Sequence, residues 1–74
     1  MMIRDMTGAR LLNPRYIKEI SVESDRDGAT KMIVAYLRGG GSATLRKVNI
    51  YDVTGADAYI ARQLELIEEM MNNA

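Results

Sequence analysis

Residues 30–38 read TKMIVAYLR, and both faces of this segment are apolar when it is extended. The alternating side chains are Met32, Val34 and Tyr36 on one face and Ile33, Ala35 and Leu37 on the other. A strand that is apolar on both faces is typical of the middle of a sheet. We therefore predict a central strand over residues 30–38, covered on both sides or nearly so.

Turn sequences bound this segment at both ends. DRDG at 25–28 precedes it and GGGS at 39–42 follows it, and both are typical of hairpin loops. Alternating apolar and polar residues predict a strand over 20–24, with a turn or bulge just before it at 15–18. Residues 43–52 predict the next strand, with a bulge near Arg46 and Lys47. Residues 1–6 and 9–12 predict an opening hairpin, closed by Asn13-Pro14.

The end of the chain, residues 54–71, predicts one long helix that opens on a sequence resembling a capping box, Thr54 to Asp57. Its apolar side chains form two adjoining stripes, which are Ile60, Leu64, Ile67 and Met71, and Tyr59, Leu66 and Met70. Together the stripes cover roughly 160° of the helix, whereas one small sheet needs about 100°. Either a wide sheet covers both stripes or another subunit meets the second. The acidic polar face disfavours a membrane surface.

These elements predict an α+β fold. We expect an antiparallel β-meander of about four strands with one C-terminal α-helix packed on one face, in a single domain over residues 1–74. The expected core is Ile20, Val22, Ile33, Val34, Leu37, Val48, Ile50, Ile60, Leu64 and Ile67. No apolar run approaches the roughly 20 residues that span a bilayer, and residues 1–6 lack the apolar stretch of a signal peptide. We therefore expect a cytoplasmic protein.

The composition disfavours an enzyme. The chain has no His and no Cys, which removes imidazole bases, thiol nucleophiles and most zinc sites. The GGGS loop leads into a strand, whereas a phosphate-binding loop would lead into a helix. Asp25 and Asp27 lack the remaining ligands of a calcium loop, and the Glu65, Glu68 and Glu69 group lacks partner helices for a metal pair. We expect no catalytic residue, cofactor, metal or small-molecule substrate.

One basic cluster suggests a second function. Strand residues with arginine, lysine and a tyrosine can form a flat surface for single-stranded nucleic acid, and the candidates here are Lys31, Tyr36, Arg38, Arg46 and Lys47. The formal net charge of zero argues against a dedicated nucleic-acid binder. Residues 1–50 carry nine basic and five acidic side chains, however, and residues 51–74 carry one and five. The more ordinary interpretation is that these charges protect a sheet edge.

The first third of the chain carries a resemblance. Gly8, the element Leu11-Leu12-Asn13-Pro14, and then Ile17 and Ile20 resemble the opening of the small flagellar FlbD-type proteins, which also place Leu-Asn-Pro between a first hairpin and an Ile-x-x-Ile segment. The resemblance covers about residues 2–23. The long C-terminal helix departs from that family's short tail, and no residue role is taken from the family.

The function expected from these patterns is a non-enzymatic protein-interaction or assembly module. A 74-residue chain has a small core and, here, no cysteine or histidine to reinforce it, so a second subunit is the remaining support. We predict a symmetric dimer that buries Tyr59, Leu66 and Met70. The alternative is a small nucleic-acid-binding accessory protein that uses the basic strand surface.

Overall fold

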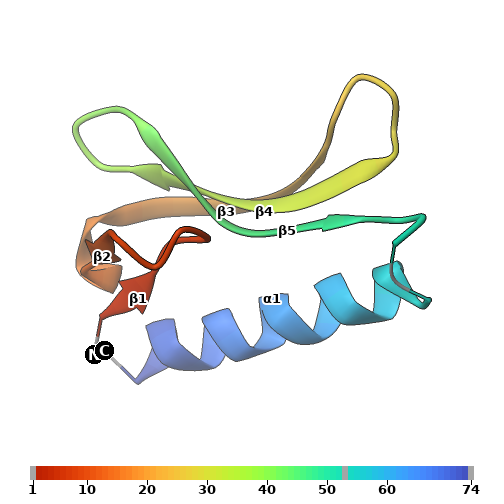
Figure 1. Cartoon of the computed structure of the whole chain (residues 1–74). Helices are drawn as coiled ribbons and strands as arrows, with labels where there is room; N and C mark the ends of the chain where they lie inside the picture. The colour runs from red at the N-terminus through yellow and green to blue at the C-terminus, as the bar shows by residue number, and fades with distance from the viewer. Residues whose placement is uncertain (1, 53, 74) are drawn as a thin grey trace.

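The computed structural model describes residues 2–52 and 54–73 and shows an α+β fold in two layers (Figure 1). A three-stranded antiparallel sheet in the order β3-β4-β5 lies over a single helix, α1. The strands are β3 (Ile17–Ser24), β4 (Thr30–Leu37) and β5 (Ser42–Asn49), and the helix is α1 (Ala56–Asn72). The prediction of β4 as the central strand is therefore confirmed, whereas the expected cover on both faces is incomplete, since Tyr36 is exposed on the face away from α1. In the described residues, α1 lies on one face of the sheet, and the loops of both hairpins bend away from that helix (Figure 1).

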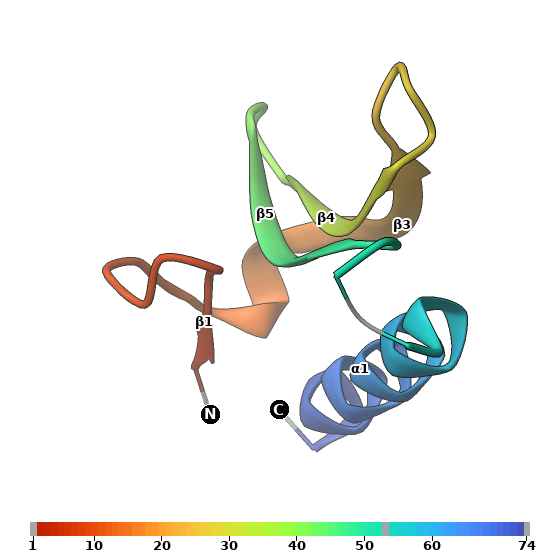
Figure 2. The same ribbon diagram turned by 45° about the vertical axis from the view of Figure 1, so that its right-hand side comes forward.

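The opening of the chain forms a separate two-stranded sheet. Strands β1 (Ile3–Arg4) and β2 (Leu11–Leu12) are only two residues long, so the predicted strands over 1–6 and 9–12 were too long. The 3-10 helix η1 (Pro14–Tyr16) then leads into β3. This hairpin is tied to the edge of β5 by the Met6 amide, which donates to the Thr44 carbonyl at 2.9 Å. The meander itself therefore has three strands, and the first two flank it (Figure 2).

Both predicted irregularities in the sheet are present. The pairing between β3 and β4 shifts between Ile17 and Glu19, which makes Lys18 the extra residue. The pairing between β4 and β5 shifts between Ile33 and Val34, whose partners are Arg46 and Thr44. Leu45 is therefore the bulged residue, just before the position predicted from the sequence. The bulge lets Leu45 enter the core, where it is fully buried.

The core lies between α1 and the helix-facing side of β4 and β5. Its fully buried centre is Ile3, Ile33, Leu45 and Ile67. Of the expected core residues, Ile33, Val48, Ile60 and Ile67 are buried in this core, and Ile20, Leu37, Ile50 and Leu64 are half-buried against it. Val34 is buried but lies outside this cluster. The prediction that Val22 belongs to the core was wrong, since this residue is 46% exposed. It lies on the edge strand β3, and α1 packs chiefly on β5 and β4.

The beginning of α1 also differs from the prediction. Gly55 is the N-cap, with φ 75° and ψ 37°, and no side chain caps the helix. Thr54 and Asp57 therefore do not form a capping box. Asp57 instead forms an ion pair with Lys31 on β4. Left-handed backbone is easily adopted by glycine alone, so Gly55 sets the direction in which the helix leaves the sheet.

Candidate interaction surfaces

The second stripe of α1 borders an open groove beside β5. The groove has a volume of about 350 Å³ and is lined by Arg46, Gln63, Leu66, Glu69, Met70 and Asn73. We call it the helix groove. Two of the three predicted interface residues, Leu66 and Met70, therefore form apolar walls of one concave surface.

The three residues of this stripe differ in how far the sheet covers them. Met70 is half-buried and packs against the core. Leu66 is half-buried, and Tyr59 is 39% exposed. Coverage of the stripe is therefore partial, with Leu66 and Met70 half-buried and Tyr59 the most exposed of the three.

One polar contact spans the groove floor. Nε of the Arg46 guanidinium donates a hydrogen bond to Oε1 of Gln63 at 3.1 Å. One terminal nitrogen of the same group donates to the backbone carbonyl of the preceding residue, Leu45, at 2.7 Å. The same nitrogen reaches the Arg4 carbonyl on β1 at 3.3 Å. Arg46 therefore links β5, α1 and the first hairpin.

The structure does not bring the five residues of the predicted nucleic-acid surface together. Lys47 lies opposite Met32, on the same face of the sheet as Tyr36, which points away from the helix. Arg46 lies opposite the core residue Ile33 and so is on the other face. Lys31 pairs with Asp57 at the start of the helix. Arg38 lies beyond the end of β4, beside η1. Alternation along the strands, together with the bulge at Leu45, divides the set between two faces and one end.

Tyr36 has a specific partner on the outer face of the sheet. Its hydroxyl donates a hydrogen bond to the Glu23 carboxylate on the neighbouring strand. This bond, with some burial and the negative charge of the carboxylate, raises the pKa of the Tyr36 phenol above its usual range. Tyr36 is therefore engaged with an acidic group and is poorly placed to stack on a nucleic-acid base.

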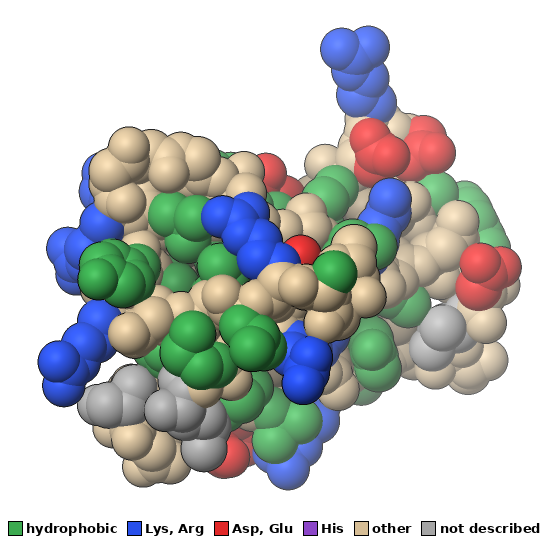
Figure 3. Space-filling model, turned by 60° about the vertical axis from the view of Figure 1, so that its left-hand side comes forward, with side chains coloured by type: hydrophobic (Ala, Val, Ile, Leu, Met, Phe, Trp, Pro, Cys, Tyr) green, Lys and Arg blue, Asp and Glu red, His purple; other side chains and the backbone are tan. Residues whose placement is uncertain are grey.

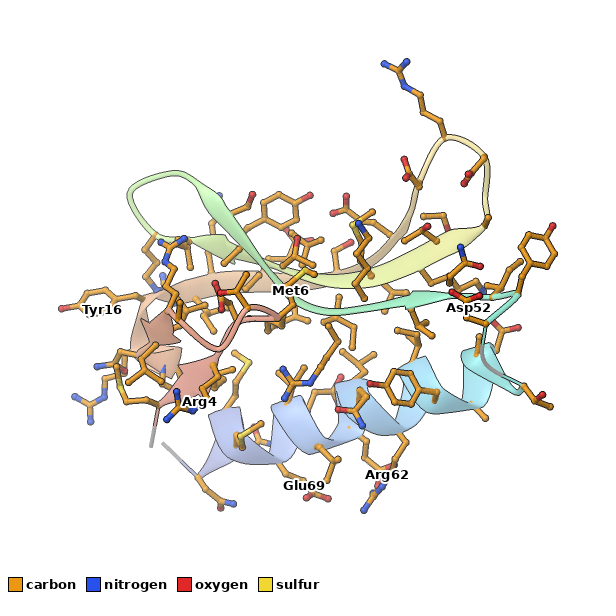
Figure 4. All side chains as sticks on the ribbon, viewed as in Figure 1. Arg4, Met6, Tyr16, Asp52, Arg62 and Glu69 are labelled. Atoms are coloured by element: carbon orange, nitrogen blue, oxygen red, sulfur yellow. The ribbon has the colours of Figure 1, made fainter. Side chains whose placement is uncertain are left out.

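A basic cluster that the sequence analysis missed lies at the end of the molecule where β2, η1 and the β4–β5 loop meet. We call it the basic end, and it consists of Arg4, Arg10, Arg15, Lys18 and Arg38, all of them exposed. In Figure 3 this end is turned forward, and basic side chains lie along the left edge and across the middle of the face, with acidic side chains at the right, near the centre and at the bottom. Figure 4 shows Arg4 and the exposed Tyr16 at this end. Four of its members lie within residues 4–18, and Arg38 joins them from the end of β4 through the hydrogen bonds with Arg15 and Tyr16.

A second cavity, also of about 350 Å³, lies at the beginning of α1 and includes Lys31, Ile50 and Asp57 in its lining. Lys31 and Asp57 face it as an ion pair and so neutralise each other. Glu65, Glu68 and Glu69 are exposed on α1, where Glu65 pairs with Arg62 at 3.0 Å. Within residues 2–52 and 54–73, no three acidic, His or Cys side chains group as a metal site would require.

No helix in the described part of the chain has both the length and the apolar character needed to cross a membrane. No protein-family model matches the sequence, and no curated protein or solved structure matches the chain.

Proposed function

We propose that this chain is a small non-enzymatic interaction module that self-associates as a two-fold dimer through α1. The observation that carries the proposal is the helix groove, whose walls are Leu66 and Met70, together with the exposed Tyr59 on the same flank of the helix. Tyrosine and methionine are enriched at protein interfaces. A cytoplasmic location belongs to the same proposal.

The flank is self-complementary when two copies of α1 lie antiparallel. Tyr59 and Leu66 are seven residues apart, which is about two turns or roughly 10.5 Å along the axis. A two-fold axis passing between Arg62 and Gln63 places Tyr59 of each copy against Leu66 of the other. Each phenol ring then lies along the apolar wall of its partner's groove, and the contact closes without propagating.

The charges along the helix agree with this direction of pairing. In the antiparallel arrangement Glu69 of one copy lies near Ala56 of the other, at the positive end of the partner's helix dipole. The dipoles of the two helices also oppose each other favourably. At exposed positions these terms guide orientation more than they add affinity, so the binding energy comes mainly from Tyr59, Leu66 and Met70.

The test is the mass in solution by light scattering, together with helical circular dichroism. We expect the unmodified protein to be a dimer and Leu66→Glu to be a folded monomer. The matched control is Ala61→Glu, because Ala61 is exposed on another side of α1 and receives the same charge. It should remain a dimer.

A second substitution keeps the test decisive if Leu66→Glu unfolds the protein. Tyr59 is exposed and outside the core, so Tyr59→Lys should preserve the fold and dissociate the dimer. An unmodified protein that is monomeric at high concentration would overturn self-association. A Tyr59→Lys protein that remains a dimer would overturn the helix flank as its interface.

A further inference from the structure

We infer that the basic end binds single-stranded nucleic acid, with its arginines on phosphates and Tyr16 as a stacking platform for a base. The five cations are Arg4, Arg10, Arg15, Lys18 and Arg38, and all are exposed. The ion pairs found within residues 2–52 and 54–73 are Lys31–Asp57 and Arg62–Glu65, so none involves this cluster. Unpaired cations that converge from separate segments are the electrostatic footprint of a polyanion site.

The centre of the cluster is held by backbone hydrogen bonds. The Asn13 side chain accepts from the Arg15 amide at 3.0 Å and caps η1. The Arg38 amide donates to the Tyr16 carbonyl at 2.8 Å, and Arg38 Nε donates to the Arg15 carbonyl at 3.1 Å. These bonds fix Arg15, Tyr16 and Arg38 side by side, so an incoming strand loses little affinity to ordering the backbone beneath it.

Tyr16 is the feature that favours nucleic acid over an acidic protein. Its side chain is 64% exposed, and Arg15 and Arg38 lie directly beside it in the backbone bonding. An exposed aromatic ring among arginines serves every base, since each base has a flat face to stack on. An acidic peptide would use the cations and would have no need of the ring.

The β1–β2 hairpin extends the same surface. Arg4 donates to the Gly8 carbonyl at 3.0 Å across its turn, and the Asp5 amide donates to the Arg10 carbonyl at 3.0 Å. Arg4 and Tyr16 lie at the same end of the molecule (Figure 4). The one acidic residue of this hairpin, Asp5, is engaged by Thr7, whose hydroxyl donates to its carboxylate at 2.7 Å.

The net charge of zero does not by itself oppose this inference, because five cations lie in or beside the opening hairpin, η1 and the end of β4, whereas Asp25 and Asp27 lie in the β3–β4 loop and Glu65, Glu68 and Glu69 lie on α1. Two acidic residues adjoin the cations in the chain, Asp5 beside Arg4 and Glu19 beside Lys18. The centre of the site, which is Arg15, Tyr16 and Arg38, shares no residue with the helix flank through which we propose self-association, so either proposal can fail without the other. Of the residues first grouped by sequence, only Arg38 belongs to the basic end.

The first experiment measures the fluorescence anisotropy of a fluorescein-labelled single-stranded pyrimidine oligonucleotide as the full-length protein is added at low salt. We expect binding whose log affinity falls with log salt at a slope of about −3.5 if all five cations meet phosphates. Arg15→Gln combined with Lys18→Gln removes two cations whose side chains form no hydrogen bond among those described, so the fold should be unaffected. The slope should then fall by about 1.4. The matched control, Arg26→Gln combined with Lys47→Gln, removes two exposed cations elsewhere and should bind as the unmodified protein does.

The second experiment separates stacking from simple charge. Tyr16→Ala should weaken binding by about five-fold or more, whereas Tyr16→Phe should bind as tightly as the unmodified protein. Polyglutamate is the competitor that represents an acidic protein, and it should displace the labelled strand poorly. An absence of binding at low salt would overturn the inference, and so would equal losses of affinity in the Arg15→Gln/Lys18→Gln variant and its control. A Tyr16→Ala protein that binds normally, while polyglutamate displaces the labelled strand fully, would also overturn it.

Discussion

Arg46 on β5 and Gln63 on α1 are joined across the two layers of the fold, with the guanidinium Nε 3.1 Å from the carboxamide oxygen. The same side chain also reaches the first hairpin through the Arg4 carbonyl. Sequence patterning grouped Arg46 with Lys47 as one basic pair. Their surroundings differ, since Arg46 is half-buried over the helix and Lys47 is exposed on the opposite face.

Replacing these two neighbours should therefore have unequal effects. Arg46→Ala removes the hydrogen bond to Gln63 and should lower the free energy of unfolding by about 1 kcal/mol. Lys47→Ala should change it by less than about 0.5 kcal/mol, as exposed substitutions usually do. Urea unfolding followed by circular dichroism measures both. Equal losses would contradict the placement of the two side chains on opposite faces.

Two apolar residues of the buried stripe of α1, Ile67 and Leu64, should also differ in their effect on stability. Ile67 is completely buried and Leu64 only half-buried. Ile67→Ala should destabilise the protein by about 2–5 kcal/mol because it leaves a cavity beneath the sheet. Leu64→Ala should cost less. Thermal melts of the two variants provide the comparison, and a larger loss for Leu64 would place the helix in a different rotation.

The beginning of α1 provides a test of its cap. Gly55→Ala places a Cβ in a left-handed conformation and should cost about 1–2 kcal/mol, although no atom lies within 4 Å of that position. Thr54→Ala should be nearly neutral, because no side chain caps this helix. Urea midpoints compare the two variants. A substantial loss at Thr54 would restore the capping box that the sequence pattern predicts.

The turn of the first hairpin should respond to acid. The Thr7 hydroxyl, with smaller help from backbone amides, lowers the pKa of the Asp5 carboxyl below its usual value. Because the folded-state pKa is the lower one, Asp5 stabilises the turn above its unfolded-state pKa and ceases to do so as the pH falls through the folded-state value. Carboxyl NMR titration should show the Asp5 pKa rising in Thr7→Val and staying low in Thr7→Ser. An unchanged Asp5 pKa in Thr7→Val would contradict this bond.

Elements with a long repeating pattern could be predicted from sequence. Residues 30–38 give a central strand because both faces are apolar, and the period of Ile60 and Ile67 gives the buried side of α1. Short elements could not, because β1 and β2 contain two residues each and their apolar residues, Ile3 and Leu12, are too few to show alternation. Both are nonetheless buried in the common core.

The candidate surfaces were harder to predict than the fold. Tyr59, Leu66 and Met70 were grouped correctly along one helix flank, because helical spacing is local. The position of Arg38 beside Arg15 and Tyr16 was missed because it arises only through tertiary pairing. The extra residue at Leu45 also changed which strand charges share a face, and its exact position depends on core packing that a one-dimensional pattern does not record.

The position of α1 after all the strands has a consequence for biosynthesis. The ribosome produces both hairpins of the meander first, and their contacts are local enough to form as the chain emerges. Ile33 and Leu45 then face solvent until Ile60 and Ile67 have been translated and have left the exit tunnel. During that interval the nascent sheet presents the apolar face that α1 later covers, so this is the stage at which a chaperone would engage the polypeptide and at which a stalled translation product would aggregate.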